Sequence, residues 1–142
     1  MPTIFSRIIS GEFPGRFVWR DSRAVAFLSI EPMRPGHTLV VPREEVDHWI
    51  DLDPDLASHL FLVAQQIGRA QRLEWNPLRV GVLIVGEEVP HVHIHVVPIN
   101  NPSELSFANV DRSPAPEALD NAAEQLRVRL RELGRTEADA EQ

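Results

Sequence analysis

Short runs of apolar residues separated by turn-forming residues predict several β-strands in this chain. Residues 17–19 and 24–28 are two such runs, and the polar residues 20–23 between them predict a β-hairpin. A third strand is expected over residues 37–41, because this run follows a loop with two prolines and a glycine and stops at Pro42.

Two further strands are expected in the second half of the chain. The apolar stretch 78–85 is rich in β-branched residues, and a loop over residues 86–90 separates it from a second run at 91–98. Because the connection is so short, the two strands are expected to pair in an antiparallel arrangement.

Apolar residues at intervals of three and four predict two amphipathic helices. The first begins at Asp53 and Pro54, since aspartate caps free amides and proline suits the first helical position. Its apolar stripe consists of Leu56, Leu60, Val63, Ile67 and Ala70. The second helix covers residues 119–133, with Gly134 as its C-terminal cap, and residues 5–9 form a short apolar turn.

The order of these elements predicts an α+β fold. Strands do not alternate strictly with helices, which favours an antiparallel sheet of about five strands with one long helix and a C-terminal helix. A chain of 142 residues fits one domain, expected over residues 1–134. Residues 135–142 are expected to be a frayed polar tail.

Composition excludes several classes of protein. A net charge of −7 argues against binding a nucleic acid polymer, and the absence of cysteine excludes disulfides and thiolate zinc sites. The sequence has no secretory signal and no apolar stretch near 18 residues. We therefore expect a soluble cytoplasmic protein that does not bind membranes.

Three of the six histidines fall within five residues, where His91, His93 and His95 alternate with aliphatic residues. In a strand they would share one face, with neighbouring Cα atoms roughly 6.6 Å apart, and the aliphatic residues would face the core. The plain alternative is a half-buried strand with a polar face. Such faces usually carry Thr, Lys, Glu or Ser, so the histidines favour a chemical role.

Two chemistries could use these histidines. Imidazoles two residues apart on a strand can meet on one zinc ion, and Glu87 and Glu88 lie near enough in sequence to assist a metal-dependent hydrolase. Alternatively, one neutral imidazole attacks phosphorus while its neighbours set its proton and orientation. The residues alone leave both chemistries open.

The run at 91–97 matches the histidine triad signature, in which three histidines alternate with aliphatic residues. Segments 3–9, 26–32 and 35–42 match in the same order, so the likeness covers approximately residues 3–99. The chain resembles the HIT (histidine triad) family and is similar to its short nucleotide-binding proteins and nucleoside phosphoramidases.

This resemblance implies a catalytic group of four histidines and a fold of the HIT type. His93 would be the nucleophile that attacks the α-phosphate and forms a nucleotidyl-histidine intermediate. His95 would hold a phosphate oxygen or steer the nucleophile, His91 would orient it from the other side, and His37 would lie nearby. The implied substrates are nucleoside phosphoramidates or related AMP adducts, with no cofactor.

The resemblance also implies a pocket for a purine nucleotide of the AMP or GMP type. Its apolar positions, each of which is also typical of an ordinary core, are Ile4, Phe5, Ile8, Phe27 and Ile30. Ser29 replaces the acidic or amide residue that binds the ribose, so Glu31 is a candidate substitute. Residues 107–109, beyond the triad, are expected to reach over a site.

Glu88 stands where relatives have a hydroxyl residue, and its charge would repel a phosphate unless it serves as the acid for an amine leaving group. Some bacterial relatives hold a structural zinc, but this chain has Thr3, Ser6 and Glu45 at the ligand positions. Hydroxyls are poor zinc ligands, so we expect no metal. His48 and His59 match no motif and are expected to be solvent or packing residues.

A homodimer is implied by the resemblance, and the segment 60–64 is apolar on all sides, as a helix buried on two sides would be. An internal core helix would have the same pattern. Ser29 and Glu88 also keep open a second function class, a nucleotide-binding module without turnover, beside the less favoured metal-dependent hydrolase.

Overall fold

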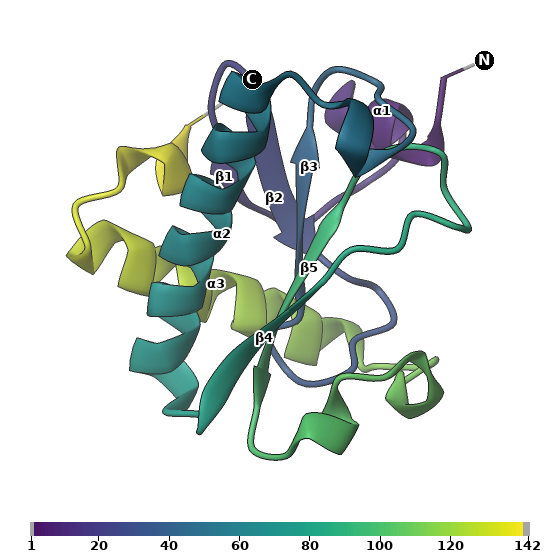
Figure 1. The fold of residues 1–142 in the computed structure, drawn as a ribbon. Coiled ribbons are helices and arrows are strands. Elements are labelled where there is room, and N and C mark those ends of the chain that lie inside the picture. The colour runs from purple at the N-terminus through teal and green to yellow at the C-terminus, as the bar shows by residue number, and fades with distance from the viewer. Residues whose placement is uncertain (1, 141–142) are drawn as a thin grey trace.

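The fold is described by a computed structural model, which covers residues 2–140 (Figure 1). Its helices and strands are, in chain order, α1 (Ile4–Ile9), β1 (Phe17–Arg20), β2 (Ala24–Leu28), β3 (Thr38–Pro42), α2 (Pro54–Trp75), β4 (Arg79–Leu83), β5 (Ile94–Ile99) and α3 (Pro116–Glu132). Within residues 2–140, no helix combines the length and apolar character needed to cross a membrane.

The five strands form one antiparallel sheet in the order β1-β2-β3-β5-β4. Both predicted adjacent pairs, β1 with β2 and β4 with β5, are present. Strand β5 lies between β3 and β4, with Thr38 opposite Val96 and Val40 opposite Ile94. The predicted α+β fold with a five-stranded sheet and a long helix is confirmed.

The two faces of the sheet have different environments. Helices α2 and α3 cover one face, where Ile94 and Val96 of β5 join the main core with Leu60 and Leu126. The other face carries a smaller cluster that includes Phe5, Phe27 and Leu39. Because side chains alternate along β5, His95 lies on this second face, away from the two large helices.

The start of β5 differs from the prediction, because the strand begins at Ile94 and not at His91. Before that point the backbone follows other partners: the His91 amide donates to Val89 O and the Val92 amide donates to Val46 O, both at 2.8 Å. Val92 still packs in the main core, as predicted. His91 and His93 therefore lie on irregular backbone, outside the sheet's hydrogen-bond ladder.

The predicted frayed tail is wrong for residues 136–140. Thr136–Asp139 is a 3-10 helix whose Ala138 is 8% exposed and belongs to the main core. Residues 141–142 lie outside the described part of the chain. A polar composition concealed one small apolar residue that packs well, so the packed unit extends past residue 134.

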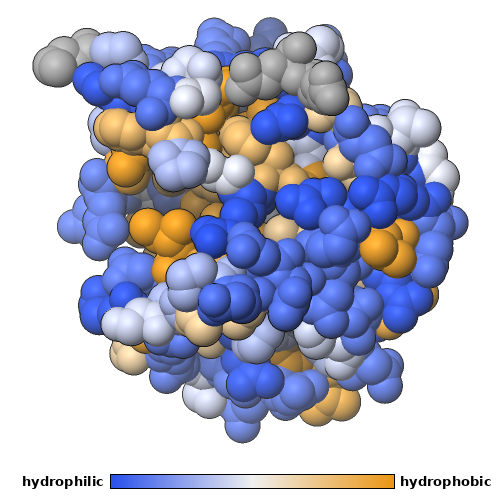
Figure 2. All heavy atoms as spheres, turned by 180° about the vertical axis from the view of Figure 1, so that it is seen from behind, coloured by the Kyte–Doolittle hydropathy of each residue, from blue (hydrophilic) through white to orange (hydrophobic). Residues whose placement is uncertain are grey.

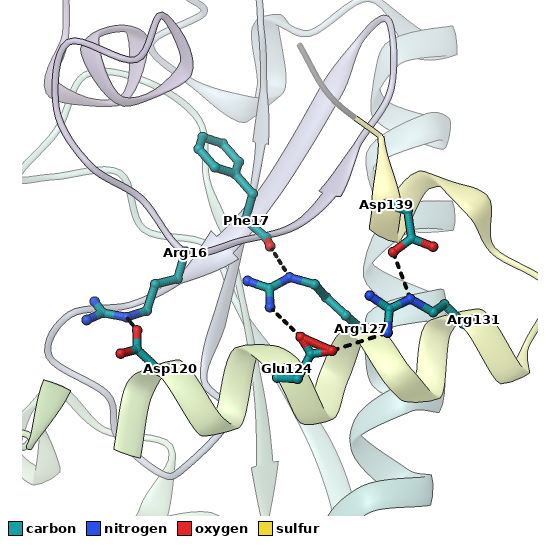
Figure 3. Close-up of polar contacts among 7 residues, drawn as sticks. All are labelled: Arg16, Phe17, Asp120, Glu124, Arg127, Arg131 and Asp139. Carbon is teal, nitrogen blue, oxygen red and sulfur yellow. Dashed lines mark hydrogen bonds and ion pairs between the residues drawn. The ribbon is translucent and has the colours of Figure 1, made fainter. Parts of the chain in front are cut away.

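Ionic contacts between α3, β1 and the tail hold this end in place (Figure 3). Glu124 lies between Arg127 and Arg131, and Arg131 also pairs with Asp139 at 2.7 Å. The guanidinium of Arg127 donates to the Phe17 carbonyl at 3.0 Å. Helix α3 is thereby tied to the edge strand β1 and to the 3-10 helix that follows it.

A tight loop places His37 at the start of β3. Gly36 has φ +91, and a Cβ atom there would lie 2.4 Å from Trp75 Cζ3, so only glycine fits. From α2, the buried amide of Gln71 donates to Gly36 O at 3.0 Å and to Val96 O at 2.9 Å. These bonds hold the strand backbones next to His37 and His95.

Candidate active site

Four histidines meet on the face of the sheet opposite α2 and α3. His37 Nε2 lies 2.9 Å from His95 Nδ1, and the rings of His93 and His95 are centred 4.9 Å apart. His91 lies behind them, at the end of β3. All four side chains are buried, with 0 to 7% exposure.

Burial lowers the pKa of each of these histidines. For His37 it lowers the pKa to about 3 and for His95 to about 4, and charge repulsion from the neighbouring histidines adds to the effect. The pKa values of His91 and His93 are also lowered, mainly by burial. All four rings are therefore neutral at pH 7, so each has one N–H and one bare nitrogen.

The hydrogen bonds of His93 determine which of its nitrogens carries the proton. His93 Nδ1 lies 2.8 Å from the carbonyl oxygen of His91, which can only accept, so Nδ1 carries the hydrogen. His93 Nε2 is then bare, and no group in residues 2–140 forms a hydrogen bond with it. A neutral imidazole in this tautomer can act as a nucleophile through Nε2.

The same argument assigns the protons of His37 and His95. The Met33 amide donates to His37 Nδ1 at 3.0 Å, so His37 carries its proton on Nε2 and donates it to His95 Nδ1. His95 must then carry its own proton on Nε2. That atom is buried and has no partner within the described chain. An unpaired buried donor is costly, and a ligand oxygen would satisfy it.

Both ring nitrogens of His91 are bound by protein groups. Nε2 lies 2.7 Å from the Pro42 carbonyl oxygen, and Nδ1 lies 2.7 Å from Thr3 Oγ1. The group of His91 that forms a hydrogen bond with His93 is therefore its backbone carbonyl.

Of the five apolar pocket residues, Phe5 contacts the histidines, and Phe27 packs beside Phe5 in the core of this face. Phe5 is centred 4.8 Å from His93 and 5.7 Å from Phe27, in edge-to-face contacts. Ile8 packs against the same cluster. Ile4 and Ile30 are 48% and 71% exposed. Such exposure is typical both of residues that line an open ligand pocket and of residues that face solvent, so it does not distinguish the two roles. Figure 2, seen from behind, shows apolar surface around a hollow near the N-terminal end.

The polar candidates lie around this group. The Ser29 amide donates to the His37 carbonyl at 3.0 Å, and Ser29 Oγ accepts from the Glu31 amide at 3.2 Å. The carboxylate of Glu31 pairs with Arg112. Glu88 is exposed, and its negative charge raises the pKa of His93, an effect smaller than the lowering by burial.

Several groups at the site carried no clear signal in the sequence. Phe107, in a 3-10 turn after β5, places its ring 5.3 Å from that of His95, where only its position had suggested a role. The Met33 amide and the Pro42 carbonyl are backbone groups, which any residue type supplies. The two unassigned histidines lie elsewhere: His48 caps a 3-10 turn, and His59 bonds Asp21 at 2.7 Å.

Thr3, Ser6 and Glu45 do come together, as a hydrogen-bonded cluster. Glu45 Oε1 accepts from the Thr3 amide at 2.9 Å and from Ser6 Oγ at 2.5 Å. Across residues 2–140, no group of three or more His, Cys, Asp or Glu side chains is arranged to hold a metal ion. One carboxylate, one imidazole and two hydroxyls are a poor donor set for zinc.

Comparisons with known proteins identify the family of this chain. A family model described as HIT domain matches residues 10–101. The chain is 32% identical over 136 residues to "Protein hit" of Bacillus subtilis, which covers 89% of this chain and 93% of that protein. It is 34% identical over 99 residues to a HIT-like protein of Methanocaldococcus jannaschii, covering 67% and 77% of the two chains.

Solved structures have the same fold. A zinc-bound histidine triad family protein from Mycobacterium smegmatis superposes with a TM-score of 0.80 and 30% identity, over 92% of this chain and 94% of that one. A hypothetical histidine triad nucleotide-binding protein from Sulfolobus tokodaii gives a TM-score of 0.82 over 98% and 99% of the two chains. Its 22% identity supports likeness of fold alone.

The lowered pKa values predict that acid destabilises the protein well before its carboxylates titrate. The pKa of histidine in an unfolded chain is 6.5. As pH falls below that value, His37 and His95 bind protons in the unfolded chain but stay neutral in the folded one, so acid favours unfolding. Each of these histidines should remove about 1.4 kcal/mol of unfolding free energy per pH unit, down to about pH 4. Urea unfolding at pH 7, 6 and 5 measures this slope.

His37→Asn should make this slope shallower, because it removes one of the buried neutral histidines. His48→Asn, at an exposed position, is the control and should leave the slope unchanged. An unfolding free energy that stays level between pH 7 and pH 5 would contradict the assignment of neutral buried histidines.

Proposed function

This chain belongs to the HIT domain family, and on that basis we propose that it is a nucleotide hydrolase or transferase acting at the α-phosphate of nucleoside phosphoramidates or related AMP adducts. Members of the family are typically hydrolases, bind nucleotides and often form dimers. The observation that carries the proposal is the bare Nε2 of His93, whose partner nitrogen is tied to the His91 carbonyl.

In the proposed reaction, His93 Nε2 forms a bond to phosphorus as the bond to the leaving group breaks. The nucleotidyl-histidine ring is then positively charged, and its Nδ1–H bond to the His91 carbonyl becomes charge-assisted and stronger. Water cleaves the new P–N bond, releases the nucleoside monophosphate and restores the neutral ring. Such a step depends on positioning and on stabilising charge on the phosphoryl oxygens.

His95 would supply that stabilisation. Its unpaired Nε2–H would donate to a phosphoryl oxygen, and the bond that it accepts from His37 at 2.9 Å keeps the proton on the side of the ligand. His37 is therefore a positioning residue that acts through His95. The Met33 amide fixes His37 in turn, so the donor is set in place before the ligand arrives.

The purine nucleoside would lie on the apolar side of the histidines, against Phe5 and Phe27. Ser29 would donate to a ribose hydroxyl, because its oxygen accepts from the Glu31 amide while its own proton is free of that bond. Glu31 is a weaker candidate for the ribose, since its carboxylate pairs with Arg112.

Two other functions are compared with this one. A nucleotide-binding module without turnover is favoured by the departures at Ser29 and Glu88. A metal-dependent hydrolase built on the triad histidines with Glu87 and Glu88 is disfavoured, because no three His, Cys, Asp or Glu side chains within residues 2–140 are arranged to hold a metal ion. The set at Thr3, Ser6 and Glu45 is also a poor zinc site, so we propose that the zinc of the M. smegmatis relative has no counterpart here. A cytoplasmic location stays a prediction from the sequence.

His93→Ala tests the proposal. With a fluorogenic adenosine phosphoramidate and chelator-treated protein, the wild type should turn over, and the variant should lose about a thousandfold or more in kcat, because the nucleophile is gone. A continuous fluorescence assay measures both rates.

The matched control is His48→Ala, an exposed histidine whose loss should leave kcat unchanged. Nucleotide binding by the wild type without turnover would favour the binding module. Turnover that appears only when zinc is added back would favour the metal-dependent hydrolase.

Glu88 is proposed as the acid that protonates an amine leaving group. Glu88→Gln should lower kcat/KM for the phosphoramidate by about tenfold or more, since general acids typically contribute a hundredfold or more when well placed. The wild type and the variant should also differ in the pH dependence of the rate, because the amide of Gln cannot supply the proton. Rate profiles from pH 5 to pH 9 measure both effects.

Glu87→Gln removes a neighbouring exposed charge and serves as the control. If Glu88→Gln keeps both the wild-type rate and the wild-type pH profile, Glu88 takes no part in the leaving-group step.

The homodimer is proposed through α2 and the edge strand β4. A groove of 560 Å³ runs between them on the α2 side of the sheet, opposite the face that carries His95, and is lined by apolar residues and by three arginines. Phe61, Leu78 and Val82 line it with 50%, 69% and 44% of their surfaces exposed. An open apolar groove beside an unpaired strand edge is typical of a surface that another chain covers.

Phe61→Glu should convert the dimer to a monomer, because it places a charge in the proposed apolar contact. Sedimentation velocity at about micromolar protein measures whether the protein is a monomer or a dimer, and a dimer is expected for an interface of standard size. Leu73→Glu is the control, since Leu73 is equally exposed on α2 but does not line the groove. A monomeric wild type under these conditions would contradict the dimer.

A further inference from the structure

We infer that Thr3 is a positioning residue for His93, acting through His91. The inference rests on the proposed function, in which His93 is the nucleophile. Thr3 Oγ1 and His91 Nδ1 are 2.7 Å apart although 88 residues separate them in the chain. The bond joins the first residue before α1 to the segment that leads into β5.

The direction of this bond follows from the other side of the ring. The Pro42 carbonyl can only accept, so His91 carries its proton on Nε2 and presents a bare Nδ1 to Thr3. The Thr3 hydroxyl must therefore donate. A longer contact of 3.4 Å to Ser6 Oγ competes for the same proton, and the shorter bond to a buried, neutral imidazole wins.

The orientation of the His91 carbonyl is set by backbone and ring together. Residues 91–93 precede β5 and lie outside its ladder, but the Val92 amide, in the same planar peptide as the His91 carbonyl, donates to Val46 O at 2.8 Å. The ring, fully buried and bonded at both nitrogens, anchors that residue from α1 on one side and from β3 on the other. The anchored carbonyl then holds the proton of His93 on Nδ1 at 2.8 Å.

Thr3 is itself held by Glu45. The carboxylate accepts from the Thr3 amide and from Ser6 Oγ, while Thr3 Oγ1 accepts from the Ser6 amide at 3.1 Å as the N-cap of α1. Hydrogen bonds to the carboxylate lower the pKa of Glu45, so it is ionised at neutral pH. One hydroxyl therefore both caps α1 and fixes His91.

The same helix carries Phe5, which contacts the rings of both His91 and His93, centred at 5.8 Å and 4.8 Å. A displaced α1 would therefore disturb the nucleophile from two directions. Positional errors at the nucleophile reduce the rate of the chemical step. Since Phe5 also belongs to the proposed nucleoside contact, a displaced α1 would raise KM as well, whereas loss of the His91 bond alone would not.

The test combines kinetics with ¹⁵N NMR of the imidazole nitrogens in the full chain. Thr3→Val keeps the shape but removes the donor, and should lower kcat for the phosphoramidate by about tenfold with little change in KM. Thr3→Ser keeps the hydroxyl and should recover kcat to within about twofold of the wild type. Thr136→Val removes an exposed threonine hydroxyl and serves as the control.

The NMR spectra separate positioning from simple stability. In the wild type, we expect the proton on Nε2 of His91 and on Nδ1 of His93; in Thr3→Val, the His93 proton should be shared between both nitrogens. Unchanged tautomers in Thr3→Val overturn the inference, even if the rate falls, because the loss would then come from α1 alone. A wild-type His91 with its proton on Nδ1 overturns it without any variant.

The two hypotheses fail in different ways. If the wild type does not turn over the phosphoramidate, the proposed function fails while the tautomers can still be read. If the wild type turns over and Thr3→Val matches it in rate and in tautomers, only the role of Thr3 is lost.

Discussion

Burial of four neutral imidazoles is the constraint on which the site depends. A buried ring nitrogen needs a partner, and six of the eight nitrogens in this group have one within the described chain. The two that remain are of opposite kinds: His93 Nε2 is a bare acceptor, and His95 Nε2 is a donor. The protein thus leaves one nucleophilic and one hydrogen-donating atom side by side, as attack on a phosphoryl group requires.

The sheet provides this arrangement by separating its two faces. The large helices bury one face. From α2, the Gln71 side chain donates hydrogen bonds to the backbone carbonyls of Gly36 and Val96, next to His37 and His95. The other face is then free for the histidines, of which His95 lies on β5, His37 directly precedes β3 and His93 directly precedes β5. The smaller elements α1 and the turn that carries Phe107 close around them, so the sheet fixes His37 and His95, while the nucleophile His93 depends on its hydrogen bond to irregular backbone.

Periodic patterns made most of the fold predictable from the sequence. The stripe from Leu56 to Ala70 predicted α2, and the turn residues between apolar runs predicted both hairpin-like pairs. The triad motif identified the histidines. Their proton positions, however, depend on the Met33 amide and the Pro42 and His91 carbonyls, which are backbone groups and cannot be predicted from residue types. Likewise, Ala138 in a polar tail gave no periodic signal of its burial.

The neutrality of the histidines also determines how the site would meet an anion. With pKa values near 3 and 4 at His37 and His95, the group has no positive charge of its own, and the chain as a whole is acidic. Attraction over distance is therefore absent, and a phosphate would be held only by oriented dipoles at contact range. Dissolved ions screen the long-range repulsion between the acidic chain and an anion and hardly affect contacts at short range, so affinity for the nucleotide should not fall as ionic strength rises.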